Sequence, residues 1–85
     1  MTPEEISQIL CQTIPDAEVH CEDLTGTGDH WQLTVISRLF EGKRLLAQHR
    51  LVKDALGHKL KDGSIHALSL KLFTPARWES KESER

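Results

Sequence analysis

His66 stands at the mouth of a run of residues that is apolar enough to form a buried strand. If the alternation of that strand extends back to it, the ring shares a face with three leucines, Leu68, Leu70 and Leu72. A neutral imidazole is a common metal ligand, and protonation removes the lone pair that binds the metal. Packing alone predicts a histidine that caps the strand with its hydrogen bonds satisfied. The residues by themselves leave both interpretations open.

His30 is the second histidine at the entrance of a predicted strand. It follows a short connection, Gly26–Asp29, whose two glycines are free to adopt positive φ. Strand alternation places its ring with Gln32 and Thr34, away from the predicted core. Such a ring could be a metal ligand, a contact for a partner, or neither.

Hydrophobic periodicity predicts the elements that would position these rings. Thr2-Pro3-Glu4-Glu5 is a capping box that begins a first helix, and Pro15-Asp16 ends it. Two antiparallel strands are expected over residues 17–25 and 31–36. A second helix is expected from Lys43 to about Leu60, where the following residues form one stripe: Leu45, His49, Val52, Leu56 and Leu60.

The remaining elements complete a single α+β domain (α/β in the broad sense) of order α-β-β-α-β, with a mixed three-stranded sheet and its helices on one face. A right-handed crossover makes the last strand parallel to the second. Pro75 ends that strand, a last helical turn finishes near Trp78, and residues 80–85 are expected to be a disordered tail. Because parallel strands begin at the same end of a sheet, the rings of His30 and His66 are predicted to lie close enough to hold one metal.

The composition bounds the class of protein. The chain has 85 residues, 28% of them charged, and a formal net charge of −2, which describes one small soluble domain and argues against a surface wholly devoted to nucleic acid. No apolar run approaches a membrane span, and the N-terminus has no signal-peptide pattern. Two cysteines ten residues apart form no disulfide framework. A reducing compartment, the cytoplasm or an organelle matrix, is expected.

The other histidines and the cysteines have simpler interpretations. His49 falls in the apolar stripe and is expected to be a core histidine that hydrogen-bonds the backbone, whereas His20 and His58 are expected on the surface. Cys21 is expected to be buried and inert. No zinc spacing, nucleotide-binding glycine pattern or catalytic triad is present, so the chain is not expected to be an enzyme.

Basic residues follow one side of the second predicted helix: Lys43, Arg50, Lys53 and Lys61. A solvated helix flank is the usual meaning of such a pattern. The alternatives are contact with phosphates or docking of an acidic partner. Because no GxxG loop is present, nucleic-acid binding ranks second.

Three motifs resemble the BolA family over roughly residues 3–79. They are Phe40-x-Gly42-Lys43 with Gln48-His49-Arg50-x-Val52, then Ile65-His66-Ala67-Leu68-Ser69-Leu70-Lys71, then Thr74-Pro75-x-x-Trp78. The entry Gly28-Asp29-His30-Trp31-Gln32 resembles the family's short-loop bacterial members. The resemblance implies a fold similar to type II KH domains.

The resemblance also implies a non-enzymatic adaptor that shares a [2Fe–2S] cluster with a monothiol glutaredoxin and its glutathione. It identifies His66 as the ligand histidine, and His30 is the nearest candidate for a second ligand, because Thr27 stands where some members place cysteine. The docking surface is predicted to include the loop residues Thr27, Gly28 and Asp29, the cations Lys43, Arg50 and Lys53, and Thr74 and Trp78. Alone, the chain is expected to carry no cofactor and to be a monomer or weak homodimer. A KH-like transcriptional regulator that binds DNA is the alternative, followed by a generic protein-interaction domain.

Overall fold

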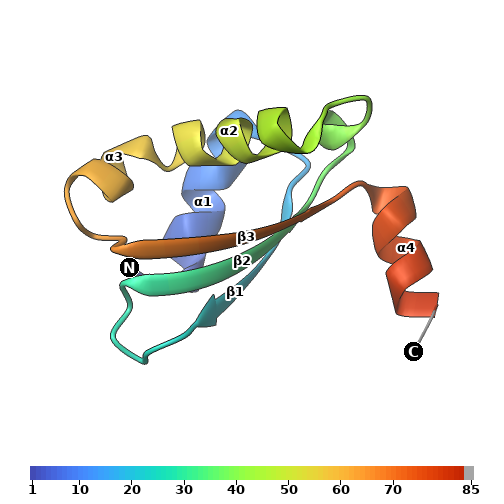
Figure 1. Ribbon diagram of the computed structural model, residues 1–85. Coiled ribbons are helices and arrows are strands. Elements are labelled where there is room, and N and C mark those ends of the chain that lie inside the picture. The colour runs from blue at the N-terminus through green and yellow to red at the C-terminus, as the bar shows by residue number, and fades with distance from the viewer. Residues whose placement is uncertain (84–85) are drawn as a thin grey trace.

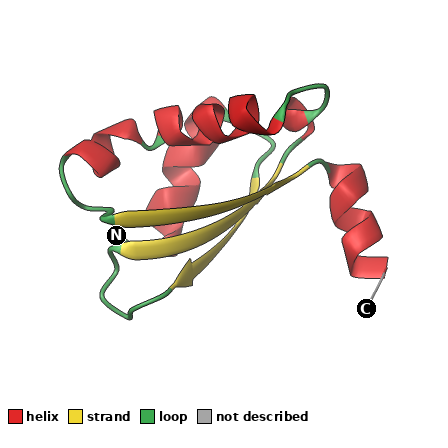
Figure 2. Cartoon of the chain, in the orientation of Figure 1, coloured by secondary structure: helices red, strands yellow, loops and turns green. Residues whose placement is uncertain are grey.

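The computed structural model describes residues 1–83, which form a three-stranded sheet with its helices (Figure 1). The elements in chain order are α1 (Pro3–Thr13), β1 (Glu18–Asp23), β2 (His30–Ile36), the 3-10 helix η1 (Arg38–Phe40), α2 (Leu45–Ala55), α3 (Gly57–Lys61), β3 (Ala67–Phe73) and α4 (Pro75–Ser83). Figure 2 shows α1, α2 and α3 over one face of the sheet and α4 beyond the end of β3. Within the described residues, the helices are too short or too polar to cross a membrane.

The sheet has the mixed topology that the sequence predicts. β2 lies in the centre, antiparallel to β1 and parallel to β3. Its inward-facing side chains are all buried: Trp31, Leu33 and Val35. The register pairs His30 with Ala67, so β2 and β3 begin at the same end of the sheet. The predicted parallel crossover is therefore confirmed.

α1 begins at the predicted capping box. The Thr2 hydroxyl oxygen accepts a hydrogen bond from the Glu5 backbone N–H at 3.2 Å, and Pro3 occupies the first helical position. The apolar side of the helix buries Ile6 and Leu10 completely. Burial of this side against the sheet anchors the helix layer, because an amphipathic helix in a domain of this size is stabilised mainly by its apolar face.

The single long helix predicted after the second strand is interrupted. Between α2 and α3, Leu56 leaves helical geometry, with φ −96° and ψ 7°, while its side chain stays fully buried. Gly57 follows, and glycine costs about 1 kcal/mol relative to alanine inside a helix. The break redirects α3 toward β3, where the Ile65 N–H donates to the Lys59 carbonyl at 3.1 Å.

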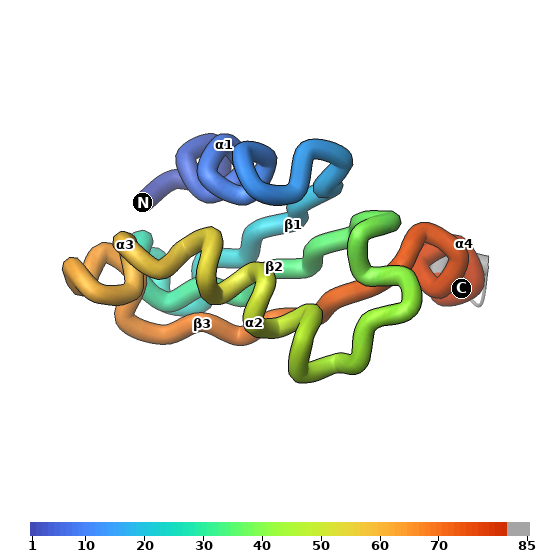
Figure 3. Tube along the Cα trace, turned by 90° about the horizontal axis from the view of Figure 1, so that it is seen from above, coloured from blue at the N-terminus to red at the C-terminus, as the bar shows by residue number. Residues whose placement is uncertain are grey.

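The predicted stripe of that helix is also shorter than expected. Val52 and Leu56 are fully buried, but Leu45 is 62% exposed and His49 is only half-buried. His49 lines an open groove with Leu45 and Leu46, so the interpretation of it as a core histidine is wrong. Seen from above in Figure 3, the start of α2 extends past β3 on the side away from α1, and the stripe loses the sheet beneath it there.

The predicted last turn near Trp78 is a longer helix. α4 continues to Ser83, and the Thr74 hydroxyl oxygen accepts a hydrogen bond from the Arg77 N–H at 3.3 Å, as expected of a cap. Residues 80–83 of the predicted tail therefore belong to α4, and residues 84–85 lie outside the described part of the chain.

Aromatic packing holds this helix against the sheet. The Trp78 ring stacks on His20 of β1, with 5.6 Å between centroids, and lies 5.3 Å from the Phe73 ring of β3. One indole thus connects both edge strands across the face that α1 and α2 leave uncovered. His20 is exposed, as expected, but it contributes to this packing.

Candidate metal centre

The two histidines predicted to meet lie side by side at the loop end of the sheet. Their ring centroids are 6.0 Å apart, with 33° between the ring planes. β3 begins at Ala67, and the residue that turns inward before it is Ile65, which is 1% exposed. His66 is exposed instead, so the expectation that it shares the leucine face of the strand is wrong. Its proximity to His30 is confirmed.

The loop that carries His30 is organised by an aspartate at its other end. β1 ends at Asp23, earlier than predicted, and residues 24–29 form the connection. One oxygen of the Asp23 carboxylate accepts hydrogen bonds from the Thr25 and Gly26 N–H groups, at 3.3 and 3.0 Å, and the other accepts from Gly28 at 2.9 Å. Three backbone donors on one carboxylate stabilise this conformation of the loop.

Gly28 is the tightest point of this loop. It has φ +77°, and a Cβ there would lie 3.2 Å from the Met1 carbonyl oxygen. Its own carbonyl accepts hydrogen bonds from the Trp31 indole N–H at 2.9 Å and from the N-terminal amine at 3.3 Å. The loop is therefore tied to the buried indole and to Met1, the residue before the N-cap of α1.

Asp29 connects the two histidines. Its carboxylate lies 2.7 Å from the His30 Nδ1, while its backbone carbonyl accepts from the N–H groups of His66, at 2.7 Å, and Ala67, at 3.2 Å. One residue therefore orients the first ring and positions the backbone of the second. The short separation of the rings follows from these backbone contacts.

Hydrogen bonds stabilise the ionised form of the Asp29 carboxylate. The hydrogen bond from the Thr27 hydroxyl, followed by that from His30, lowers the pKa of Asp29 from 3.8 to about 2. A carboxylate that accepts from Nδ1 selects the His30 tautomer whose Nε2 carries the free lone pair. Carboxylate–histidine pairs of this kind orient ligand rings at metal sites.

These residues fit a metal that takes two imidazole ligands. Within residues 1–83, the His66 ring forms no hydrogen bond, and no cluster of three or more His, Cys, Asp and Glu residues has the geometry to hold a metal ion. Gly63 lies beside His66: a Cβ on Gly63 would be 3.8 Å from the His66 Nε2. The φ of Gly63, +83°, turns the chain toward the histidines. Cys21 pairs with Leu33 in mid-strand, where burial raises the pKa of its thiol.

The other residues predicted to contact a partner lie in separate places. Lys43 and Arg50 line a groove of about 420 Å³ along α2, together with Arg44, while Lys53 lies on a neighbouring side of the helix. Thr74 lies just beyond the far end of β3, about 26 Å along the strand from His66 at 3.3 Å per residue, and Trp78 packs against Phe73 at that end. The loop residues Thr27, Gly28 and Asp29 alone are brought into the histidine site.

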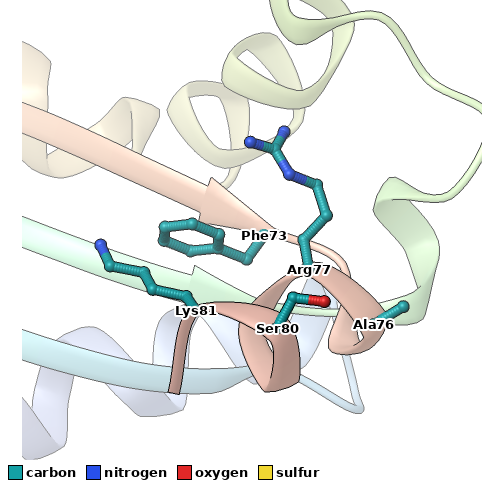
Figure 4. Close-up of a pocket in the computed structure, with 5 residues that line it drawn as sticks. All are labelled: Phe73, Ala76, Arg77, Ser80 and Lys81. Atoms are coloured by element: carbon teal, nitrogen blue, oxygen red, sulfur yellow. The ribbon is translucent and has the colours of Figure 1, made fainter. Parts of the chain in front are cut away.

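A second groove, of about 510 Å³, opens beside Phe73 at that far end (Figure 4). The Lys81 ammonium lies 4.9 Å from the centroid of the Phe73 ring, and the Arg77 guanidinium lies 6.0 Å from it. These distances are those of cation–π contacts, with Arg77 at the outer limit. The groove is therefore part of the packing of α4 on β3.

Two residues of the histidine site were missed by the sequence analysis. Asp23 was read as a strand residue, although an aspartate two and three positions before Thr25 and Gly26 is a typical side-chain turn signal. The proximity of Gly63 to His66 depends on the path of α3 and could not be inferred from spacing.

Comparison with known proteins identifies the fold and the family. The family described as BolA-like protein matches residues 4–77. The acid stress protein IbaG of Escherichia coli K12 is 33% identical over 78 residues, covering 92% of this chain and 89% of that protein. The protein BOLA2 of Arabidopsis thaliana is 37% identical over 81 residues, covering 93% and 85%. The structure of a bolA protein homologue from Coxiella burnetii superposes with a TM-score of 0.76 at 38% identity, covering 93% and 97%. The chain therefore belongs to the BolA-like family.

Proposed function

We propose that this chain is a non-catalytic adaptor that pairs with a monothiol glutaredoxin and shares a [2Fe–2S] cluster with it. His66 and His30 would bind one iron of the cluster, and thiolates of the glutaredoxin and of glutathione would provide the remaining ligands. The cluster is the cargo of this complex, in assembly, trafficking or iron regulation. The observation that carries the proposal is the pair of imidazoles 6.0 Å apart on an exposed rim.

The chemistry of the two rings supports this assignment. Two histidines on one iron of a [2Fe–2S] centre are a known arrangement in proteins, and they raise the reduction potential relative to four thiolates. Protonation of either ring removes a ligand, so the cluster should be held less tightly as pH falls. Asp29 orients the His30 ring, because its carboxylate fixes the tautomer that binds through Nε2.

Co-expression with a monothiol glutaredoxin tests the proposal. The purified complex should show visible absorption and circular dichroism of a [2Fe–2S] cluster, and His66→Ala should change the spectrum and shorten the lifetime of the cluster. His58→Ala is the matched control, because His58 is exposed on α3, outside this rim. If His66→Ala behaves like His58→Ala, the ligand assignment is wrong.

His30 requires its own variant. His30→Ala should shift the visible dichroism and weaken the cluster if the ring is a ligand. If the spectrum is retained while complex formation weakens, His30 is a partner contact and another group completes the coordination of the iron.

A second candidate function rests on the groove of α2. Three cations, Lys43, Arg44 and Arg50, line it with a single carboxylate, Asp54. A KH-like regulator that binds DNA would use this side, and its affinity would fall with salt concentration. Binding that is indifferent to Arg50→Glu and Lys53→Glu would eliminate this alternative.

A further inference from the structure

β3 is an edge strand whose outer backbone groups have no partner within the described chain. The N–H of Ala67 and the C=O of Phe73 both bond toward the β2 side, to the Asp29 carbonyl and the Ser37 N–H. In a parallel pair the backbone groups of alternate residues point to opposite sides of the strand. The N–H and C=O groups of the intervening residues therefore point away from the sheet: Leu68, Leu70 and Leu72.

The two edges of the sheet differ in charge. β1 exposes Glu18, Glu22 and Asp23, and charged side chains discourage pairing at an edge. β3 carries a single charge, that of Lys71, in seven residues. Of the two, β3 is the edge on which another strand can add.

An apolar helix end overhangs this edge. Leu45 and Leu46, at the start of α2, are 62% and 64% exposed, and with His49 and Lys53 they line a groove of about 300 Å³. Leu51, later in the same helix, packs against the core. In Figure 3 the start of α2 reaches past β3, and in Figure 1 it lies above the C-terminal half of that strand. Exposed leucines thus stand beside an unpaired strand.

We infer that β3 pairs antiparallel with β3 of a second copy of this chain, about a two-fold axis at Leu70, to form a continuous six-stranded sheet. In this register, Leu68 faces Leu72 of the other copy, and the three outward-facing residues form about six backbone hydrogen bonds. The overhanging end of α2 then covers the inward-facing Leu68 of the second copy. The inference goes beyond the proposed function and does not depend on it.

Charge selects this register over its neighbours. On the uncovered face of the sheet, Lys71 stands directly opposite Ser69 of the second copy, and both side chains are exposed. A pairing centred on Lys71 would place the two lysines face to face, which is unfavourable. A pairing centred on Ser69 would leave Leu72 without a cross-strand leucine. The Leu70 register joins every outward-facing residue and opposes no like charges.

Two substitutions at Ser69 test this arrangement in opposite directions. Ser69→Glu places a carboxylate opposite Lys71 at two symmetric sites, and Ser69→Lys places a second lysine there. Sedimentation velocity from micromolar to millimolar concentration should show the wild type dimerising, with the dimer roughly tenfold tighter in the first variant and roughly tenfold weaker in the second. Glu22→Gln on the β1 edge raises the net charge by one, as Ser69→Lys does, and should leave the dimer unchanged.

Hydrogen exchange provides the second measurement, because the register determines which backbone amides form hydrogen bonds across the dimer. The amides of Leu68, Leu70 and Leu72 should become protected as the concentration rises, whereas that of Ser69, already bonded to β2, should not change. A chain that stays monomeric at millimolar concentration overturns the inference. A dimer whose affinity does not depend on the sign of the charge at position 69, or in which those three amides stay unprotected, also overturns the inference.

Discussion

Replacing Asp16 with alanine is expected to lower the free energy of unfolding by about 2 kcal/mol. Asp16 lies between α1 and β1, and its carboxylate accepts hydrogen bonds from the Ser37 hydroxyl at 2.6 Å and the Arg38 N–H at 2.9 Å. Ser37 follows β2 and its own N–H donates to the Phe73 carbonyl at 3.1 Å. Asp16 thus joins the turn after α1 to the far ends of β2 and β3.

The magnitude follows from the different burial of the two donors. Ser37 is 1% exposed, so its hydroxyl loses its acceptor where water cannot replace it, which costs about 1–3 kcal/mol. The Arg38 N–H lies on an exposed residue, so water restores most of its hydrogen bond. In a domain of this size a loss of about 2 kcal/mol lowers Tm by about 10 °C.

Urea unfolding of a double-mutant cycle measures this directly. Asp16→Ala should be costly in the wild type and nearly neutral after Ser37→Ala, because the buried donor is then gone. A loss below about 0.5 kcal/mol in the first background, or an equal loss in both, refutes the reasoning.

The same pair predicts a pH dependence. The hydrogen bond from Ser37, followed by that from Arg38, lowers the pKa of Asp16 below 3.8. Because the folded-state pKa is the lower one, the stabilisation is complete above 3.8 and is lost as pH falls through the lowered value. The wild type should therefore converge on Asp16→Asn in acid. The difference between the two proteins is the quantity to follow, since other carboxylates also titrate there.

Three further predictions concern the loop and the helix break. Gly28→Ala should lower the free energy of unfolding by about 1–2 kcal/mol because of the positive φ, and by more because the new Cβ would lie 3.2 Å from the Met1 carbonyl oxygen. Gly26→Ala, with φ +76° and open space around it, should show only the loss from φ. Urea unfolding of both variants measures the difference. Asp29→Asn should weaken metal or cluster binding through His30 by about 10-fold to 100-fold with the fold intact, measured by competition with a chelator. Gly57→Ala, whose Cβ meets nothing within 4 Å, should stabilise the chain by about 0.4–1 kcal/mol, and an unchanged Tm would contradict this.

The juxtaposition of His30 and His66 could be predicted because it needs only local signals and one chirality rule. Two strand entrances and a helix between them define a parallel pair, and parallel strands begin together. The structure places the two ring centroids 6.0 Å apart. The same local signals predicted the cap at Thr2 and the turn glycines correctly.

The features that could not be predicted depend on contacts between distant residues. α4 has no apolar stripe, and Trp78 holds it through His20 and Phe73, residues of two other elements. Leu45 belongs to the stripe of α2 by its spacing, and the overhang of that helix past the sheet is what exposes it. Periodicity describes which side of a helix is apolar but not how far the partner surface extends.

The Asp29 carbonyl, which accepts from two successive N–H groups at the start of β3, makes the spacing of the two imidazoles a property of the backbone. The entropy of bringing two nitrogen donors together is therefore lost during folding rather than when an ion arrives. Breaking those two hydrogen bonds would separate the rings in one event, so any group that both rings hold would lose both nitrogen ligands together.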